Sequence, residues 1–538
     1  MDIVTNDRIA LAEANTTVQH DQDNDSSQGV LSGLLEGWSY MQLFITFVLL
    51  CATYDQVMYQ WRKGSIAGPR FKIPFMGPFF QALYPKWDGY LAQWASGPLS
   101  CVSVFHKFVV LAADRDLAYK IFRSPTYASP CIVPVAKNLM RPDAFVFLMG
   151  KAHAEFRRGL ASIFTNRALS IYLPRQEKVY EDYFDRFVKE SEAAGNQPRP
   201  FFKHCRQLNC GLSCRTFFGD YISEDAIAQI ADEFYIITAA LELVNFPYAI
   251  YIPFTKPWWG KRVSDRVLKE FTACAEKCKI NMANGAEPTC TVDEWVVHMM
   301  ASDDYRKRVA AGEKNVEKPA NLIRDFSAFE IAQTMFAFLF ASQDASASAT
   351  IWMFQILAQR PDVLDKVREE NLRVRGGDKD KPYTLEIYEK LTYTNAVVKE
   401  LLRWRPPVIF IPYNVDKDFP ITPDYTIKKG SIVVPSTYPA LQDPVAYPNP
   451  ETFDPDRWIT GDAETKTRNW LVFGSGGHDC LARKYVPLSM ALMVGKASMG
   501  WNWVHHPTPQ SENIRVFACL FPEDECPLVW SRRTENDV

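Results

Sequence analysis

The chain has 538 residues, of which 60 are Lys or Arg and 63 are Asp or Glu, so its formal net charge is −3. This near-neutral balance lacks the basic excess of nucleic-acid-binding proteins and argues against that class of function. Hydrophobic residues make up 47% of the chain and charged residues 23%, values typical of a folded globular protein. The 12 cysteines include no Cys-x-x-Cys pair, so for nearly all of them the composition predicts free or buried thiols in a reducing compartment.

Residues 37–54 contain no charged residue and, as a helix of about 27 Å, are long enough to cross the hydrocarbon core of a bilayer. The residues before this segment are mainly acidic, whereas basic residues follow it. The positive-inside rule therefore predicts a transmembrane anchor at 37–54 and a lumenal tail at 1–36, which carries glycosylation sequons at Asn15 and Asn24. A cleaved signal peptide is disfavoured because the apolar run starts late, and a buried core helix is the remaining alternative.

The rest of the chain is predicted to be one large domain. Residues 55–80 are rich in proline and glycine and indicate a stiff linker, which leaves 81–538 for the domain itself. Residues 99–113 predict two β-strands joined by a tight turn, and helical patterns dominate from 114 to about 402. Short strand signals return at 406–455, so the predicted fold class is mainly α with a small β portion.

A long apolar segment, 331–359, contains one charged residue, Asp344, in a polar middle that includes Ser342 and Ser346. A membrane span is excluded because an ionised carboxylate and its polar neighbours would be costly at mid-bilayer. The pattern instead predicts a helix through the centre of a soluble domain, with the polar cluster facing a cavity. A buried acid beside hydroxyl groups suits proton delivery, and a fully hydrogen-bonded polar patch that bends the helix is the alternative.

The loop 470–483 contains three glycines followed by Cys480, and an apolar pattern at helical spacing begins at Leu481. A cysteine at a helix N-terminus is stabilised as a thiolate, which makes it a suitable anionic metal ligand. Zinc is a poor alternative because His478 is the single further ligand nearby. A nucleophilic cysteine with His478 as its base is also disfavoured, because two residues this close on one loop have poor geometry.

Four motifs in this order and spacing resemble the cytochrome P-450 superfamily. They are Ala341-x-x-Asp344, Glu400-x-x-Arg403, Phe453-x-Pro455-x-Arg457-Trp458 and Phe473-x-x-Gly476-x-x-x-Cys480-x-Ala482. From about Gly68 to near the C-terminus, stretches such as GPRFKIPFMGPF, VFLMGKAHAEFRRGL and FPEDECPLVW are similar to the fungal sterol 22-desaturases. The resemblance implies the cytochrome P-450 fold with an N-terminal transmembrane helix, and an enzyme that introduces a double bond at carbon 22 of a sterol side chain in ergosterol synthesis.

The resemblance also implies a cofactor, an oxidant, an electron-donating partner and a location in the cell. Its cofactor would be haem b, held by a haem-thiolate catalytic domain at 81–538, and its oxidant would be O2. Electrons would come from NADPH through a partner, an NADPH-cytochrome reductase. The protein would lie in the endoplasmic reticulum membrane as a single-pass protein with its catalytic domain in the cytosol. Lys466, Arg468, Arg483 and Lys484 flank the cysteine loop and could form a basic docking face for the reductase, or a solvated charged rim.

The family motifs assign roles to individual residues. Cys480 would be the axial thiolate of the haem iron, and Phe473 would pack against its sulfur. Side chains of His153, Arg157 and His478 would donate hydrogen bonds to the haem propionates, and Glu400, Arg403 and Arg457 would form a structural network. Asp344, followed by Ser346, would deliver protons. By analogy, the substrate pocket would draw on 130–147, Phe340, 409–411 and 520–521.

Three positions depart from the family pattern. Ala345 stands where most members have a threonine, so Ser346 would take over the proton relay. Gly477 and Ala482 stand where the desaturases usually have proline and glycine. Haem binding tolerates these changes, but the departures leave the function of the protein open to two alternatives. One is a monooxygenase that hydroxylates a steroid or triterpenoid in specialised metabolism. The other is a non-catalytic haem- or sterol-binding protein.

Overall fold

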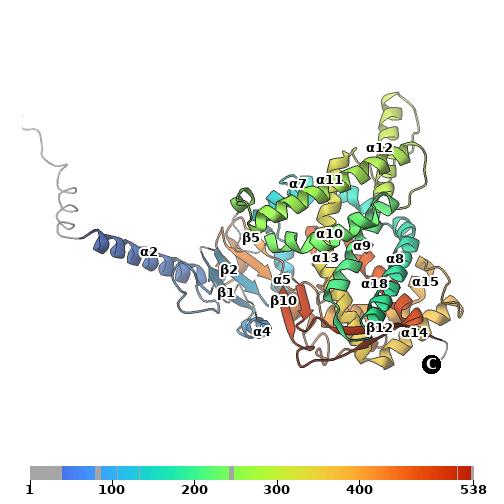
Figure 1. The fold of residues 1–538 in the computed structure, drawn as a ribbon. Helices are drawn as coiled ribbons and strands as arrows, with labels where there is room; N and C mark the ends of the chain where they lie inside the picture. The colour runs from blue at the N-terminus through green and yellow to red at the C-terminus, as the bar shows by residue number, and fades with distance from the viewer. Residues whose placement is uncertain are drawn as a thin grey trace, which may run out of the picture. The chain divides into compact units, whose positions relative to one another are not determined.

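The computed structural model describes residues 39–78, 86–105, 107–131, 134–241, 247–517 and 519–534 (Figure 1). The predicted tail at 1–36, with its sequons at Asn15 and Asn24, lies outside the described residues. The chain divides into two compact units, Met1–Met58 and Tyr59–Val538.

The first unit contains most of helix α2 (Tyr40–Lys63), which includes the predicted anchor. The helix continues past the predicted end at Tyr54 because residues 55–63 contain neither glycine nor proline, and it ends at Gly64, whose φ is +51°. Its apolar window has a mean hydropathy of 1.4, and none of that window is buried, which disfavours a buried core helix. Among the described helices it is the one that is long and apolar enough to cross a membrane.

The second unit begins its β portion with the predicted hairpin, which the structure confirms. Strands β1 (Leu99–Val104) and β2 (Lys107–Ala112) pair in antiparallel register. Strand β2 also pairs in parallel with β8 (Ile432–Pro435). Strands β5 (Tyr413–Val415) and β3 (Ala128–Pro130) complete a sheet of order β1-β2-β8-β5-β3. This sheet therefore joins the start of the domain to the segment that follows its central helices.

Three smaller sheets are also present in the described part of the chain. Two are hairpins: β6 (Phe419–Thr422) with β7 (Tyr425–Ile427), and β10 (Ile514–Phe517) with β11 (Cys519–Pro522). The third has the order β4-β12-β9 and consists of β4 (Arg199–Pro200), β12 (Pro527–Arg532) and β9 (Trp501–His505).

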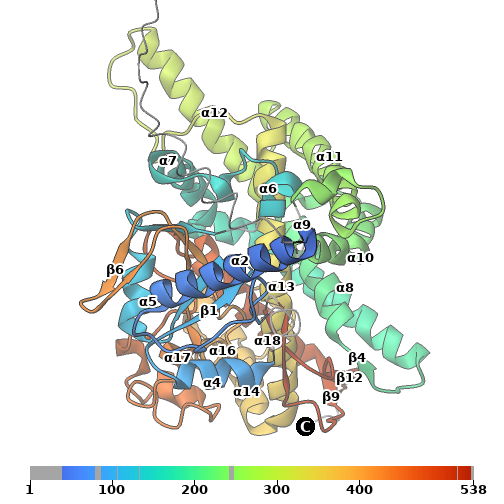
Figure 2. The same cartoon turned by 90° about the vertical axis from the view of Figure 1, so that its left-hand side faces the viewer.

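Helices make up most of the second unit, and the long α13 packs against α9 and α11 (Figures 1 and 2). The helices are α4 (Trp87–Ala95), α5 (Arg115–Phe122), α6 (Pro134–Met140), α7 (Gly150–Leu160), α8 (Asn166–Ala193), α9 (Phe202–Phe218), α10 (Glu224–Ala240), α11 (Lys256–Ala283), α12 (Thr291–Ala310), α13 (Ala328–Gln359), α14 (Pro361–Arg375), α15 (Leu385–Lys390), α16 (Thr392–Trp404), α17 (Tyr438–Leu441) and α18 (Tyr485–Gly500).

Helix α13 is the predicted central helix, and the structure confirms it. Ser327 and Glu330 form a capping box at its N-terminus. Most of its residues are buried, but Ala341, in the middle of the helix, is exposed, and Ala345 and Ser346 are half-buried. Ala341 and Ala345 lie four residues apart and share one side of the helix, and Ser346 lies next to Ala345 at the edge of that side. This stripe is the accessible part of an otherwise mostly buried helix.

Candidate active site

The loop before Cys480 is a tight turn that requires glycine. Gly474 and Gly476 have φ values of +67° and +83°, which L-residues with side chains rarely adopt. A Cβ atom at Gly476 would also lie 2.5 Å from the carbonyl oxygen of Phe122. The backbone N–H of Cys480 donates to the carbonyl oxygen of Phe473 at 2.9 Å and closes the turn. The loop thereby fixes the direction in which the Cys480 side chain leaves the backbone.

Cys480 lies in a recess of the protein. Its side chain is exposed, yet the surrounding protein is close enough that burial raises the pKa of its thiol. A hydrogen bond from the backbone N–H of Ala482 opposes this shift and stabilises the thiolate. The helix does not start directly after the cysteine as the sequence pattern predicts. A 3₁₀ turn, η8 (Leu481–Arg483), comes first, so the free N–H groups of this turn, rather than of α18, face the sulfur.

Nitrogen donors gather beside this loop. Helix α7 places His153 and Arg157 one turn apart on one face. The imidazole of His153 stacks on that of His478 with ring centroids 3.9 Å apart. Burial, together with the neighbouring His478 and Arg157, lowers the pKa of His153 to about 4, and burial also lowers the pKa of His478. Both imidazoles are therefore neutral at pH 7, and each carries one N–H that can donate to a carboxylate.

Asp479 is a member of this group that the motifs do not single out. Its carboxylate forms an ion pair with Arg157 and a second one with Arg483 at 2.9 Å. It lies between His478 and Cys480 in the loop, so it holds the Arg157 guanidinium close to the cysteine. The thiol of Cys480, the imidazoles of His153 and His478 and the guanidinium of Arg157 therefore all come from α7 and the cysteine loop.

Glu400, Arg403 and Arg457 come together in a fully hydrogen-bonded network. Arg403 donates to both Glu400 carboxylate oxygens, at 2.9 and 2.7 Å, and Arg457 donates to one of them at 3.0 Å. Trp458 Nε1 and the backbone N–H of Asp454 add further hydrogen bonds at 2.9 and 3.0 Å. Glu400 and Arg403 are completely buried. The network ties helix α16 to the segment that leads into the cysteine loop.

Asp344 is buried, and its carboxylate contacts α9 and α10. Its Oδ1 lies 3.2 Å from Arg206 of α9, and its Oδ2 accepts a hydrogen bond of 3.4 Å from Thr238 of α10. Burial raises the pKa of Asp344, against the opposing effects of Arg206 and Thr238. Ser346 lies two residues further on and projects from a different side of the helix, so the structure does not pair it with Asp344.

The regions assigned to a substrate pocket by analogy have mixed environments. Phe340 and Ile411 are half-buried. Leu520 and Phe521 are completely buried, and the Leu520 carbonyl accepts a hydrogen bond of 3.0 Å from Trp352 Nε1 of α13. These two residues therefore belong to the core that supports α13. Part of 130–147 lies outside the described residues.

The family model described as Cytochrome P450 matches residues 67–496. Together with the mainly helical fold, this shows that the chain belongs to the cytochrome P450 family, which confirms the predicted fold class. The chain is 66% identical over 523 residues, 97% of its own length and 98% of the relative's, to C-22 sterol desaturase ERG5B of Gibberella zeae. It is also 66% identical over 505 residues, 94% of its length and 95% of the relative's, to Cytochrome P450 monooxygenase oblE of Emericella variicolor.

The fold is also that of a solved cytochrome. The structure titled "Retinoic acid bound cyanobacterial CYP120A1" matches with a TM-score of 0.70 at 21% identity, covering 87% of this chain and 99% of that chain. Family membership makes the protein a haem-thiolate oxidoreductase that uses haem iron, O2 and electrons from a reductase. The residues at this site fit haem: Cys480 offers a thiolate, and His153, His478 and Arg157 offer donors suited to the two carboxylates of haem.

Sequence reasoning missed three members of the site: Asp479, Arg206 and Thr238. Asp479 was visible within the quoted cysteine motif, next to a residue that was singled out. The other two carry no local signal. Arg206 and Thr238 lie on helices separated from Asp344 by more than a hundred residues in the sequence, and the contact depends on how α9 and α10 pack against α13.

Proposed function

We propose that this cytochrome P450 desaturates carbon 22 of a sterol side chain in ergosterol biosynthesis. The observation that carries the proposal is 66% identity to a C-22 sterol desaturase over 97% of the chain. In the balanced reaction, the sterol loses two hydrogens, O2 is reduced to two waters, and NADPH supplies the remaining two electrons through a reductase. The protein must therefore hold the side chain, deliver protons and exclude oxygen insertion.

Residues of the cysteine loop and of α7 would hold haem b. The Cys480 thiolate would bind the haem iron, and haem held there would supply the activation of O2. The side chains of His153, His478 and Arg157 bind the propionates, with Asp479 keeping Arg157 in place. The Phe473 side chain would cover the Cys480 sulfur, and its backbone carbonyl accepts the hydrogen bond from Cys480 that closes the loop. Each of these groups orients the cofactor without entering the chemistry of the substrate.

Asp344 would supply protons to the reaction. Its raised pKa lets the buried carboxyl bind and release a proton more readily near neutral pH than an exposed aspartate does. Arg206 and Thr238 hold the carboxylate when the proton leaves. Ser346, which is half-buried on the accessible side of α13, would pass the proton onward through water, because it does not contact Asp344 directly.

Oxygen insertion is the second candidate outcome, and a specific observation favours it. The chain is as similar to a relative named as a monooxygenase as it is to a C-22 sterol desaturase, 66% identical in both cases. The substrate would then be a steroid or triterpenoid in specialised metabolism. Family membership supports an oxidoreductase over the non-catalytic haem- or sterol-binding alternative.

The proposed location is the endoplasmic reticulum membrane, with a single span, a glycosylated lumenal tail at 1–36 and a cytosolic catalytic domain. Helix α2 supports the span. Exposed aromatic residues Tyr248, Tyr251 and Phe254 around η4 (Pro247–Tyr251) offer a second apolar surface for lipid.

The reductase would dock on the basic residues around the cysteine loop. Lys466, Arg468 and Arg483 each have one acidic neighbour, and Lys484 is exposed. Acidic groups of the reductase could replace the acidic neighbours in these ion pairs. The cost in free energy would be small because the ion pairs are mostly exposed.

The deciding experiment is mass analysis of the product made from a 22-saturated ergostane sterol by the purified enzyme with reductase and NADPH. Loss of two hydrogens from the side chain supports desaturation, and gain of one oxygen supports the monooxygenase. An unchanged sterol, from enzyme that shows the red-shifted carbon monoxide band of thiolate ligation, would overturn this substrate class. Cys480→Ala should abolish both the band and the product, and a band that survives would disprove the ligand assignment.

A further inference from the structure

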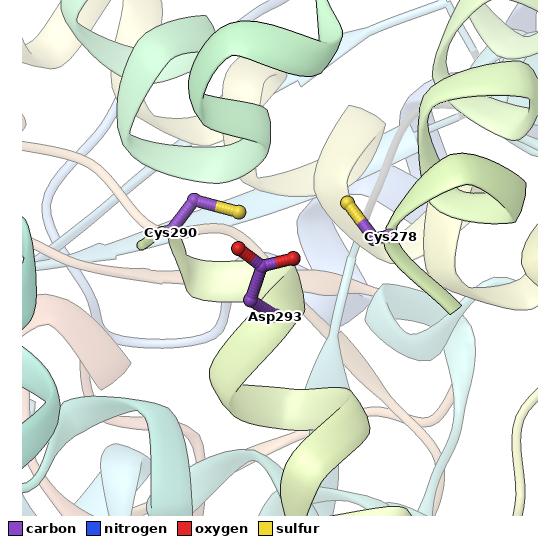
Figure 3. Close-up of side chains that lie close together, drawn as sticks. All are labelled: Cys278, Cys290 and Asp293. Carbon is purple, nitrogen blue, oxygen red and sulfur yellow. The ribbon is translucent and has the colours of Figure 1, made fainter. Parts of the chain in front are cut away.

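A cluster of thiols lies away from the cysteine loop, where α9, α11 and α12 meet. Cys278 is on α11, Cys290 directly precedes α12, and Asp293 is in the first turn of α12. The two sulfur atoms and a carboxylate oxygen of Asp293 all lie within 4.8 Å of one another. Figure 3 shows both sulfur atoms and the carboxylate directed toward a common point. All three residues are buried, and neither cysteine forms a disulfide.

The Asp293 carboxylate is incompletely satisfied. Its Oδ2 accepts hydrogen bonds of 3.1 Å from the backbone N–H and the hydroxyl of Thr289. Its Oδ1 accepts no hydrogen bond, although the residue is 0% exposed. Within the described residues, no lysine, arginine or histidine forms an ion pair with it, and the nearby Arg175 is bound to Asp220 at 2.6 and 3.1 Å. A buried carboxylate without a positive partner is costly, so a cation is the missing component.

We propose that Cys278, Cys290 and Asp293 bind one Zn²⁺ ion. Two thiolates and one carboxylate form a donor set that zinc accepts in tetrahedral geometry, and thiolate ligands select zinc over magnesium or calcium. On binding, the two thiols release their protons to solvent and the ion bonds to both sulfur atoms and to Asp293. No electron is transferred, so the step needs neither an oxidant nor a reductant.

A fourth ligand would complete the tetrahedron from the side of the cluster near Tyr221. Tyr221 is half-buried, and its hydroxyl accepts a hydrogen bond of 3.1 Å from the exposed Asn281. Burial, with smaller contributions from Asp293, Cys278 and Cys290, raises the pKa of Tyr221 to about 12. A water molecule or this hydroxyl completes the tetrahedron, and the side near Tyr221 gives the ion its route from solvent.

The ion would act as a structural cross-link. Cys278 lies in the last two turns of α11, and Cys290 and Asp293 lie at the start of α12. A metal that joins them closes the connection between the two helices and fixes their crossing. The site shares no residue with the proposed haem and proton-delivery groups, so its loss should leave the carbon monoxide band in place.

The test uses the full-length holoenzyme in detergent, loaded with Zn²⁺ and dialysed against a weak chelator. Elemental analysis should find one zinc per chain in addition to haem iron. Asp293→Asn and Cys290→Ser should each weaken zinc binding by at least about tenfold. The matched control is Cys274→Ser, which removes a buried free cysteine one turn from Cys278 on the same helix face and should keep the zinc.

A measurement on the unaltered protein keeps the proposal testable even if a variant does not fold. X-ray absorption at the zinc edge should show two sulfur neighbours at about 2.3 Å and lighter neighbours at about 2.0–2.2 Å. A shell of oxygen and nitrogen alone would overturn the proposal. So would folded holoenzyme without zinc, or zinc held equally tightly by Asp293→Asn and by the unaltered protein.

Discussion

Glu400 and Asp344 are both carboxylates buried on helices of the same domain, and both face arginines. The Glu400 oxygens accept hydrogen bonds from two arginines, an indole and a backbone N–H. Asp344 has one hydrogen bond of 3.4 Å and one ion pair, and its Oδ1 lacks a well-aligned donor. Burial alone therefore does not separate a structural acid from a functional one. The completeness of the hydrogen bonding does.

The difference has a physical reason. A carboxylate that accepts several N–H groups is held in its charged form, because protonation would break those bonds. A carboxylate with few partners stays close to the balance between its charged and neutral forms, and burial moves that balance toward the neutral form. Glu400 is thus suited to a permanent framework, whereas Asp344 is suited to gaining and losing a proton.

The largest expected effect tests the structural half of this comparison. Glu400→Gln leaves the buried Arg403 and Arg457 without their shared negative charge, which should cost about 3–5 kcal/mol of folding free energy. We expect little or no holoenzyme, measured by the carbon monoxide difference spectrum per milligram of protein. Lys399→Ala is the matched control, because the neighbouring Lys399 forms a pair with Glu464 that is 35% and 54% exposed. A normal yield of Glu400→Gln holoenzyme would show that the Glu400 charge is not needed for the folded structure.

The functional half is tested by Asp344→Asn, which keeps the shape of the side chain. Removal of a proton donor should lower turnover about 100-fold per carbon-monoxide-binding enzyme, while the yield of holoenzyme stays near normal. Thr334→Ala on the same helix serves as the control, since the Thr334 hydroxyl is used within the helix, donating to the Glu330 carbonyl at 2.8 Å. Unchanged turnover of Asp344→Asn would remove Asp344 from the proton path.

A third acid, Glu330 at the start of α13, provides a further test, because its pKa shifts in the opposite direction from that of Asp344. Hydrogen bonds from Arg324 and from Ser327 lower the pKa of Glu330 to about 2. The stability that this group contributes is present above its ordinary pKa and is lost as the pH falls toward 2. Because the group is partly exposed, Glu330→Gln should cost at most about 1 kcal/mol at pH 7. Thermal unfolding should show this difference shrinking below about pH 4.5.

The smallest effect is the pH dependence of stability at Asp344. Its raised pKa means that the folded state binds the proton more tightly than the unfolded state does. This contribution to stability is fully present below about pH 4 and is lost as the pH rises through the raised pKa. Asp344→Asn stays neutral, so its unfolding temperature should rise relative to the unaltered protein between pH 4 and pH 7. An opposite trend would contradict the raised pKa.

Local patterns predicted much of the fold. The alternation in 99–113 gave the hairpin, and the apolar run in 331–359 gave the central helix, because each signal is contained in its own segment. The spacing of Glu400 and Arg403 placed them on one helix face, but their complete burial depended on the segment that carries Arg457 and Trp458. The α-helix expected directly after Cys480 starts later, at Tyr485. Helix propensity in the sequence does not distinguish a single 3₁₀ turn from the first turn of an α-helix.

Contacts between distant helices could not be predicted. The partners of Asp344 come from α9 and α10. Helical periodicity predicts which face of a helix is buried, but it does not predict which other helices pack against that face. The cluster of Cys278, Cys290 and Asp293 was equally invisible, since it follows none of the spacings by which metal sites are recognised in sequences. In both places the chemistry arises where separate helices meet.

The parallel pairing of β2 with β8 has a consequence for synthesis of the chain. The hairpin β1–β2 can form early, but the strand that covers its second edge is made roughly 320 residues later. At about 5–20 residues per second, the ribosome needs roughly 15–65 s to reach that strand. For this interval β2 presents an unpaired edge, the kind of surface that associates with other strands. Correct assembly of the nascent enzyme therefore depends on keeping this edge protected until β8 arrives.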